Sequence, residues 1–176
     1  MFERHDDAAR VMAVLPKRFG KYGLRLHPEK TKLLEFRKPA SGSGGQPPDS
    51  PPGSRTFDFL GFTHHGGTSR WGKGIIKRRT ASKRRRRALE RVKTWCREHR
   101  HDPLVHQQKM LSSKLKGHFG YYGITGNSSM LGKFRGHVIF VWYKALARRS
   151  QRGMTWETMQ KVLTRYVLPP TRIVHS

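Results

Sequence analysis

The amino-acid sequence predicts an α+β fold, in which a small β-containing unit is followed by an α-helical bundle. Two patterns carry this prediction. Before residue 80, apolar residues alternate with polar or small ones on both sides of a Gly-Gly pair, as in a hairpin. From Ser82 onward, apolar residues recur at helical spacing. The hydrophobic fraction of 35% is modest but falls in these periodic segments, which favours one or two folded domains over a disordered basic tail.

The N-terminal part predicts a helix, a strand and a loop. Asp6 is a candidate N-cap, apolar residues then follow at helical spacing as far as Tyr22, and Gly23 suits a left-handed cap. A strand is expected through residues 33–36. Residues 37–55 are rich in Gly, Ser and Pro, which is typical of a flexible surface loop.

The next part predicts two strands. Residues 56–62 alternate aromatic with small or polar side chains, and most of these phenylalanines are expected in the core. Gly66-Gly67 is a hairpin turn signal, after which a second strand is expected through residues 74–77.

Four helices are expected in the bundle. The first spans residues 82–99 and buries Val92 and Cys96, and Asp102 caps the second, which carries an apolar stripe that ends at Phe119. Glycines then interrupt the pattern.

The third and fourth helices begin at polar residues. Ser128 opens the third helix and Thr155 caps the shorter fourth. Trp142 and Trp156 lie on the apolar stripes of these helices, so both are expected in the bundle core.

Net charge is the strongest indication of a partner. The chain has 37 Lys and Arg against 11 Asp and Glu, a formal net charge of +26 and a pI near 11.4. Such a fold repels itself unless a polyanion screens it, and nucleic acid is the usual polyanion. No apolar run reaches transmembrane length and the N-terminus has no signal-peptide core, so a cytoplasmic protein without a membrane partner is expected.

Cysteine and histidine usage gives no prediction of a metal site. Cys96 is the single cysteine, which excludes an internal disulfide, and its bland interpretation is a small apolar residue on a helix face. His99, His101 and His106 lie near it in the sequence, but the spacing fits no familiar zinc module.

Cations are densest between residues 70 and 100, where fourteen Lys or Arg face only Glu90 and Glu98. Five of them, 83–87, wrap the N-terminal end of a predicted helix, where the helix dipole already favours anions. A charge run is often only a solvated face, but phosphate binding explains this one better. The candidate phosphate contacts are Lys77, Arg78, Arg79, Lys83, Arg84, Arg85, Arg86, Arg87, Arg91, Arg148 and Arg149. Tyr121 and Tyr122 lie between glycines and are candidates for either base contact or core.

Three ordered strings give a family resemblance. They are GLRLHPEKT at 23–31, FDFLGF at 57–62, and a spaced set consisting of GHFGYYG at 117–123, RRSQ at 148–151, TW at 155–156 and LPPTRI at 168–173. In this order they resemble the bacterial reverse transcriptase–maturases that group II introns encode. The resemblance covers nearly the whole chain apart from the Gly/Pro loop.

The resemblance implies two domains and further site residues. Residues 1–79 resemble the end of the polymerase palm, and residues 80–176 the helical thumb, or maturase-specific domain X. In such a palm, Lys30 approaches the phosphates of the incoming nucleotide. The segment that includes Gly61 resembles the hairpin that grips the 3′ end of a primer, where a glycine allows close backbone approach.

The resemblance also implies that this chain has no complete polymerase site. In the family, the metal-binding Asp pair lies just before the segment that matches this N-terminus. Nucleotidyl transfer needs carboxylates that hold two Mg²⁺ ions, and the only adjacent acidic pair, Asp6-Asp7, is interpreted as a helix cap. We therefore expect no catalytic residue, no metal site and no cofactor in this chain alone, and Mg²⁺ only in a complete polymerase.

The expected function is RNA binding that assists group II intron folding and splicing. The implied partners are the intron RNA, a DNA primer or target strand, and a separate chain that supplies fingers and palm. Two alternatives stay open: a subunit of a split RNA-directed DNA polymerase, and a truncated reading frame without function.

Overall fold

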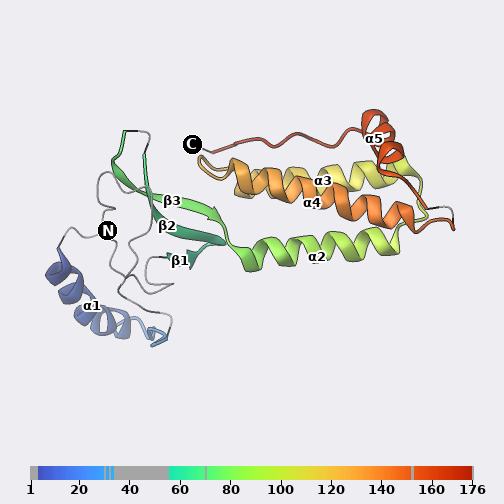
Figure 1. The fold of residues 1–176 in the computed structure, drawn as a ribbon. Helices are drawn as coiled ribbons and strands as arrows, with labels where there is room; N and C mark the ends of the chain where they lie inside the picture. The colour runs from blue at the N-terminus through green and yellow to red at the C-terminus, as the bar shows by residue number, and fades with distance from the viewer. Residues whose placement is uncertain are drawn as a thin grey trace. The chain divides into compact units, whose positions relative to one another are not determined.

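The computed structural model describes residues 4–29, 31, 33, 56–69, 71–151 and 153–175. In this part of the chain, five helices and a three-stranded antiparallel sheet form an α+β fold, which confirms the predicted class (Figure 1). The chain divides into two compact units, residues 1–56 with 65–76 and residues 57–64 with 77–176.

The first unit contains helix α1, which spans His5–Gly20. The helix begins one residue earlier than predicted, because Arg4 takes the extended N-cap conformation. Asp6 is therefore not the N-cap, and the prediction of a cap at this residue is wrong. Asp6 and Asp7 lie in the first turn, where carboxylates interact favourably with the helix dipole. Of the residues in α1, only Ala8 is buried.

Gly23 ends this segment as predicted. Its φ of +69° is left-handed, the Leu24 N–H donates to Phe19 O (3.0 Å) and the Gly23 N–H donates to Gly20 O (3.1 Å). These two hydrogen bonds form a Schellman motif, which satisfies carbonyls that the helix end leaves unpaired. The predicted strand at 33–36 and the predicted loop at 37–55 lie outside the described residues, apart from Leu33, which has no regular structure.

The sheet has the order β1-β2-β3, with β1 at Thr56–Phe59, β2 at Phe62–Thr68 and β3 at Gly74–Thr80. The prediction of one strand over residues 56–62 is wrong, because Leu60 (φ +48°) and Gly61 (φ +82°) form a two-residue turn. Positive φ at both central residues is the geometry of a type I′ hairpin.

The second turn also lies elsewhere than predicted. Gly66 and Gly67 are inside β2 and do not form the hairpin turn. Ser69 and Lys73 pair between β2 and β3 instead, where the Ser69 N–H donates to Lys73 O (2.8 Å) and the Lys73 N–H donates to Ser69 Oγ (3.0 Å). The serine hydroxyl supplies an acceptor for a backbone N–H, and Gly72 supplies the left-handed conformation (φ +74°), so both residues favour this turn.

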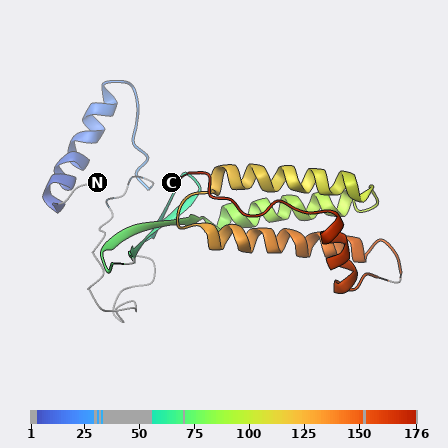
Figure 2. The same cartoon turned by 90° about the horizontal axis from the view of Figure 1, so that it is seen from above.

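The second unit is mainly a helical bundle. It contains α2 (Ser82–Glu98), α3 (Leu104–Tyr122), α4 (Ser128–Ala147) and α5 (Trp156–Arg165). Helices α2, α3 and α4 lie side by side, and α5 packs at the end of the bundle far from the start of α2 (Figures 1 and 2). The core joins residues from all four helices and the C-terminal segment: Val92, Cys96, Leu111, Leu115, Phe119, Leu131, Phe134, Val138, Ile139, Trp142, Leu146, Met159 and Leu168.

Most predicted helix starts are confirmed. Helices α2 and α4 begin at Ser82 and Ser128, and the Thr155 side chain caps α5 by accepting from the Thr158 N–H (3.3 Å). The prediction that Asp102 caps α3 is wrong, because the N-cap is Pro103 and no side chain caps that end. The Asp102 carboxylate binds two histidines instead, as described below.

The two tryptophans differ in burial. Trp142 is fully buried, as predicted, but Trp156 is 45% exposed, so its prediction as a core residue is wrong. Trp156 is the first residue of α5 and lies edge-on to Tyr143, with ring centroids 5.3 Å apart. The buried core residue of α5 is Met159. Among the strand phenylalanines, Phe59 is likewise 56% exposed.

The C-terminal segment, residues 166–175, runs back along the bundle in an extended conformation (Figure 2). The Arg135 guanidinium donates to Pro169 O (2.9 Å) and Leu168 O (3.2 Å). The N–H groups of Val174 and His175 both donate to Gly123 O, at 2.6 and 2.9 Å. Side-chain and backbone bonds therefore hold this segment on the helices at both of its ends.

Candidate nucleic-acid interface

Exposed cations gather on β3 and on the N-terminal half of α2. We call this set the basic surface. Its eight members are Lys77, Arg78, Arg79, Lys83, Arg84, Arg86, Arg87 and Arg91, all of which are exposed. Arg85, also predicted as a contact, is half-buried. Within the described part of the chain, no carboxylate forms an ion pair with any of the eight.

Helical periodicity explains why these side chains point outward. Val92 and Cys96 are buried against α3 and α4, with Ala88 and Leu89 packed beside them, so the core-facing stripe of α2 leaves the opposite positions to the cations. The first turn of α2 contains no acidic residue, and Ala81 cannot cap it. Positive side chains thus surround a helix N-terminus that itself carries a partial positive charge.

Asn127 fixes the junction between β3 and α2. Its amide group is completely buried, accepts from the Thr80 N–H (3.0 Å), and donates to Thr80 Oγ1 and Tyr122 O (both 2.8 Å). Thr80 is the last residue of β3 and is also buried. One side chain therefore ties the strand that carries part of the basic surface to the end of α3 and the start of α4.

The β1–β2 turn rests on the end of α3. The Tyr121 hydroxyl donates to Leu60 O (2.8 Å), and a Cβ added at Gly61 would lie 3.0 Å from the Tyr122 hydroxyl oxygen. Glycine at position 61 thus allows a close approach of the backbone. The groups that approach it here are the chain's own tyrosines, and not a primer strand as the resemblance implies. The Gly61 carbonyl also accepts from the Ala81 N–H (2.9 Å), which joins the turn to the start of α2.

The two tyrosines serve this packing. Phe62 stacks on Tyr121, with ring centroids 5.9 Å apart, and meets Tyr122 edge-on at 5.3 Å. Burial raises the pKa of Tyr122, the neighbouring Tyr121 raises it further, and the positive charge of Arg84 partly opposes both effects. The structure therefore brings Gly61, both tyrosines and the basic surface together. Tyr121 remains 55% exposed beside it.

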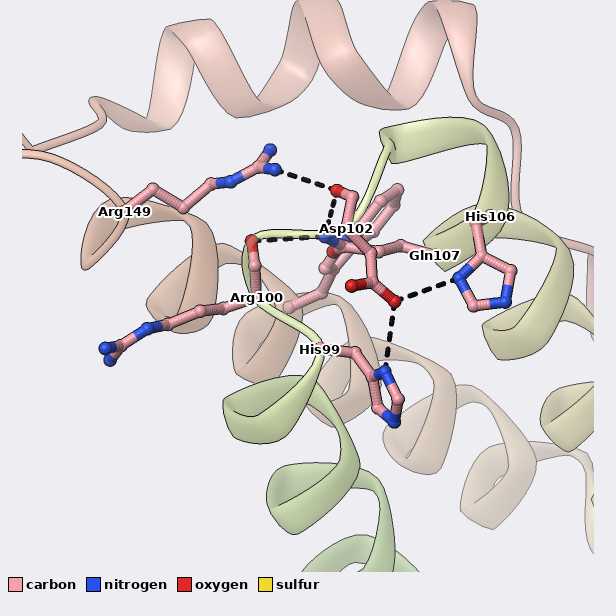
Figure 3. Close-up of polar contacts among 7 residues, drawn as sticks. His99, Arg100, Asp102, His106, Gln107 and Arg149 are labelled. Atoms are coloured by element: carbon pink, nitrogen blue, oxygen red, sulfur yellow. Dashed lines mark hydrogen bonds and ion pairs between the residues drawn. The ribbon is translucent and has the colours of Figure 1, made fainter.

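Arg148 and Arg149, predicted as a second phosphate contact, lie just after the C-terminal end of α4. The Arg149 Nη2 donates to the Asp102 backbone carbonyl (2.8 Å), so this side chain has a structural role (Figure 3). Arg148 is exposed. Arg148 lines the same groove as Arg97 and Arg100, at the C-terminal end of α2. Since α2 rises by about 1.5 Å per residue, this end is about 10 Å along the helix axis from Arg91 and about 22 Å from Lys83.

Asp102 is the centre of a polar network at the α2–α3 turn (Figure 3). Its Oδ2 accepts from the Nδ1 atoms of His99 and His106, both at 3.0 Å. Partial desolvation raises the pKa of Asp102, but the hydrogen bonds and charges of the two histidines outweigh it, and the pKa is lowered. Gln107 completes the network. Its Nε2 donates to Asp102 O (2.9 Å), and its Oε1 accepts from the buried Trp142 Nε1 (2.7 Å).

A groove between α2 and α4 was not predicted from the sequence. It has a volume of about 480 Å³, and its lining includes Lys93, Arg97, Lys144, Arg148 and the exposed ring of Phe140. Helix periodicity places the four helical members, Lys93, Arg97, Phe140 and Lys144, on the outside of their own helices. Only the pairing of α2 with α4 brings them together.

Other predicted features have simple outcomes. Lys30 lies outside the described residues. Cys96 is buried, as predicted, and burial raises the pKa of its thiol to about 12 although the positive charge of Lys114 lowers it. Among the residues that the structure describes, no group of His, Cys, Asp or Glu side chains could hold a metal ion. None of the described helices is both long enough and apolar enough to cross a bilayer.

His118, in the GHFGYYG string, gives the bundle a predictable acid sensitivity. Its ring stacks on Phe134 at 3.8 Å, and burial lowers its pKa from 6.5 to about 4. Between those pH values the unfolded chain binds a proton that the folded chain does not, so stability that is present above pH 6.5 is lost as the pH falls towards 4. Because the ring is partly exposed, we discount the full shift and expect a loss on the order of 2 kcal/mol.

Urea unfolding at pH 7.5 and pH 4.5 measures this loss. The variant His118→Phe keeps the stacked ring but cannot be protonated, so its unfolding free energy should fall less over the same interval. An equal fall in both proteins would show that other groups cause the acid sensitivity.

Comparison with known proteins gives no match. No family model matches the chain, and neither a curated protein nor a solved structure does. The resemblance to group II intron proteins, which the three strings carry, therefore stays a prediction.

Proposed function

We propose that this chain binds structured RNA through the basic surface, and that it acts as a maturase-type protein that helps a group II intron RNA to fold and splice. The observation that carries the proposal is the group of eight exposed cations around the start of α2, without carboxylate partners in the described part of the chain. Each phosphate that such a cation neutralises releases condensed counterions, which favours binding.

The geometry favours a shaped phosphate surface over a single anion. Lys77, Arg78 and Arg79 follow one another on a strand, so their side chains alternate between the two faces of the sheet. The cations of α2 continue from the end of that strand, and Asn127 fixes the junction between them. Folded RNA presents phosphates in several directions together with 2′-hydroxyl groups, and proteins recognise it largely by such shape.

In this proposal the RNA performs the splicing chemistry. The protein neutralises phosphates that approach each other in the folded intron, and thereby stabilises the active RNA structure. The order of the three sequence strings supports the intron as the RNA concerned.

The test compares two fourfold variants with the unchanged chain. The first replaces Lys83, Arg84, Arg86 and Arg87 by Gln and leaves the half-buried Arg85 in place. The matched control replaces four exposed lysines outside the basic surface, Lys109, Lys116, Lys133 and Lys161, and so removes the same net charge. Retention of a folded intron transcript is measured across a salt series.

We expect the first variant to bind about 10- to 100-fold more weakly near physiological salt, and the slope of log affinity against log salt to fall by about 3. The control should bind within about threefold of the unchanged chain, because scattered charges act mainly at long range and are screened. If both variants lose affinity equally, bulk charge and not the basic surface binds the RNA. If neither does, the proposal is wrong.

A further inference from the structure

The groove between α2 and α4 is a second concentration of charge, separate from the basic surface. Its cations are Lys93 and Arg97 of α2, Arg100 of the following turn, Lys144 of α4, and Arg148. Its volume of about 480 Å³ lies within the usual range of small-ligand sites. The Arg100 side chain points away from the Asp102 network, although its backbone carbonyl is part of that network (Figure 3).

The positive charge of the groove is not balanced by the negative groups around it. Glu90 is the single carboxylate of its lining, and it pairs only loosely with Lys93 (3.6 Å). Five cations against one carboxylate leave a formal charge of +4. The C-terminal ends of α2 and α4 face this region, but two helix ends contribute only about −1 together. Roughly three positive charges remain to attract an anion.

An aromatic ring lies among these cations. Phe140 is 50% exposed, and the Lys144 Nζ is 5.3 Å from its ring centroid. The exposed half of this apolar ring would be stabilised if a ligand covered it, because burial of apolar surface is favourable. Beside phosphate-binding cations, an aromatic ring is the surface on which unpaired bases stack.

We propose that this groove binds an unpaired nucleotide of a single strand, with its base on the Phe140 ring and its backbone phosphates on the surrounding cations. A duplex keeps its bases stacked inside and offers the ring no partner. An acidic peptide would satisfy the cations but would leave the ring unused. The site shares no residue with the basic surface, and its binding does not require that the chain act on intron RNA.

The test is a double-mutant cycle on the full chain. One probe is a labelled RNA hexamer, and the other has the same six-residue backbone without bases. Both are titrated by fluorescence anisotropy against the unchanged chain and against Phe140→Ala. Because Phe140 is half exposed and alanine favours helix, the variant should fold, and its thermal unfolding is measured to verify this.

We expect removal of the bases to weaken binding by about tenfold more in the unchanged chain than in Phe140→Ala, the size of one base–aromatic stack. Arg97→Gln with Arg148→Gln should weaken both probes, and by more than the matched pair Lys109→Gln with Lys116→Gln. A cycle without coupling overturns the proposal, as does a polyglutamate hexamer that displaces the RNA hexamer as well as unlabelled RNA does.

The same cycle separates this site from the proposed function. In the fourfold variant of the basic surface, the coupling between the bases and Phe140 should persist. If folded intron RNA binds equally well to that variant while the coupling remains, only the proposed function fails. If the coupling is absent while the basic-surface variant loses intron RNA, only the groove proposal fails.

Discussion

Replacing Asn127 with alanine is expected to lower the free energy of unfolding by about 3–5 kcal/mol. The change removes three hydrogen bonds and leaves the Thr80 N–H and hydroxyl and the Tyr122 carbonyl without this partner in a buried position. An unsatisfied buried polar group costs about 1–3 kcal/mol, and here three groups lose the same partner at once. Chemical unfolding followed by circular dichroism measures the loss.

Two further variants define the cause. Ser129→Ala changes an exposed residue two positions further on, in the first turn of α4, and its unfolding free energy should stay within about 0.5 kcal/mol of the unchanged chain. Asn127→Asp keeps an acceptor for the Thr80 N–H but loses both donated bonds, so it should also destabilise. If Asn127→Ala costs less than about 1 kcal/mol, this side chain does not fix the β3–α2 junction as described.

Gly123→Ala is expected to detach the C-terminal segment. An added Cβ would lie 2.3 Å from Phe119 O and 2.7 Å from Arg172 O, closer than carbon and oxygen can approach. Since both obstacles are backbone atoms, relief requires that the segment move. The bonds from Val174 and His175 to Gly123 O would then be lost. We expect a destabilisation of about 2–4 kcal/mol, the range of overpacking with lost hydrogen bonds.

Amide hydrogen exchange tests this locally. The Thr125 N–H donates to His175 O (3.1 Å), so its protection should fall in Gly123→Ala while that of the α2 core persists. Gly117→Ala is the matched control, because Gly117 lies inside α3, the helix that Gly123 ends, with open space around the added Cβ. It should stabilise the chain by about 0.5–1 kcal/mol. Equal behaviour of the two variants would contradict the steric argument.

Local sequence signals predicted the bundle helices well but not the turns of the sheet. Helix starts at Ser82 and Ser128 and the cap at Thr155 follow from periodicity and polar side chains, which act within one or two turns. The turn at Leu60-Gly61 has no Asn-Gly or Gly-Gly signal. Contacts with Tyr121 and Tyr122, sixty residues away in the sequence, hold it instead. Tertiary contacts thus overrode the local pattern.

The candidate site was predictable only where it depends on local sequence. Charge density alone indicated the cations of α2, and the structure confirms that most of them are exposed. Arg149 was predicted from the adjacent cations Arg148-Arg149, but its guanidinium donates a hydrogen bond to the Asp102 backbone carbonyl. The α2–α4 groove depends on which helices pack together. No spacing within either helix contains that information.

The state of the core thiol has a practical consequence. Cys96 is the single cysteine of the chain, it is 1% exposed, and a pKa of about 12 leaves almost none of it as the thiolate that reacts with alkylating reagents at neutral pH. A cysteine introduced at an exposed position would therefore take up a fluorophore or spin label selectively, without removal of the native one. Labels beside Phe140 and at the start of α2 would then report separately on the groove and on the basic surface.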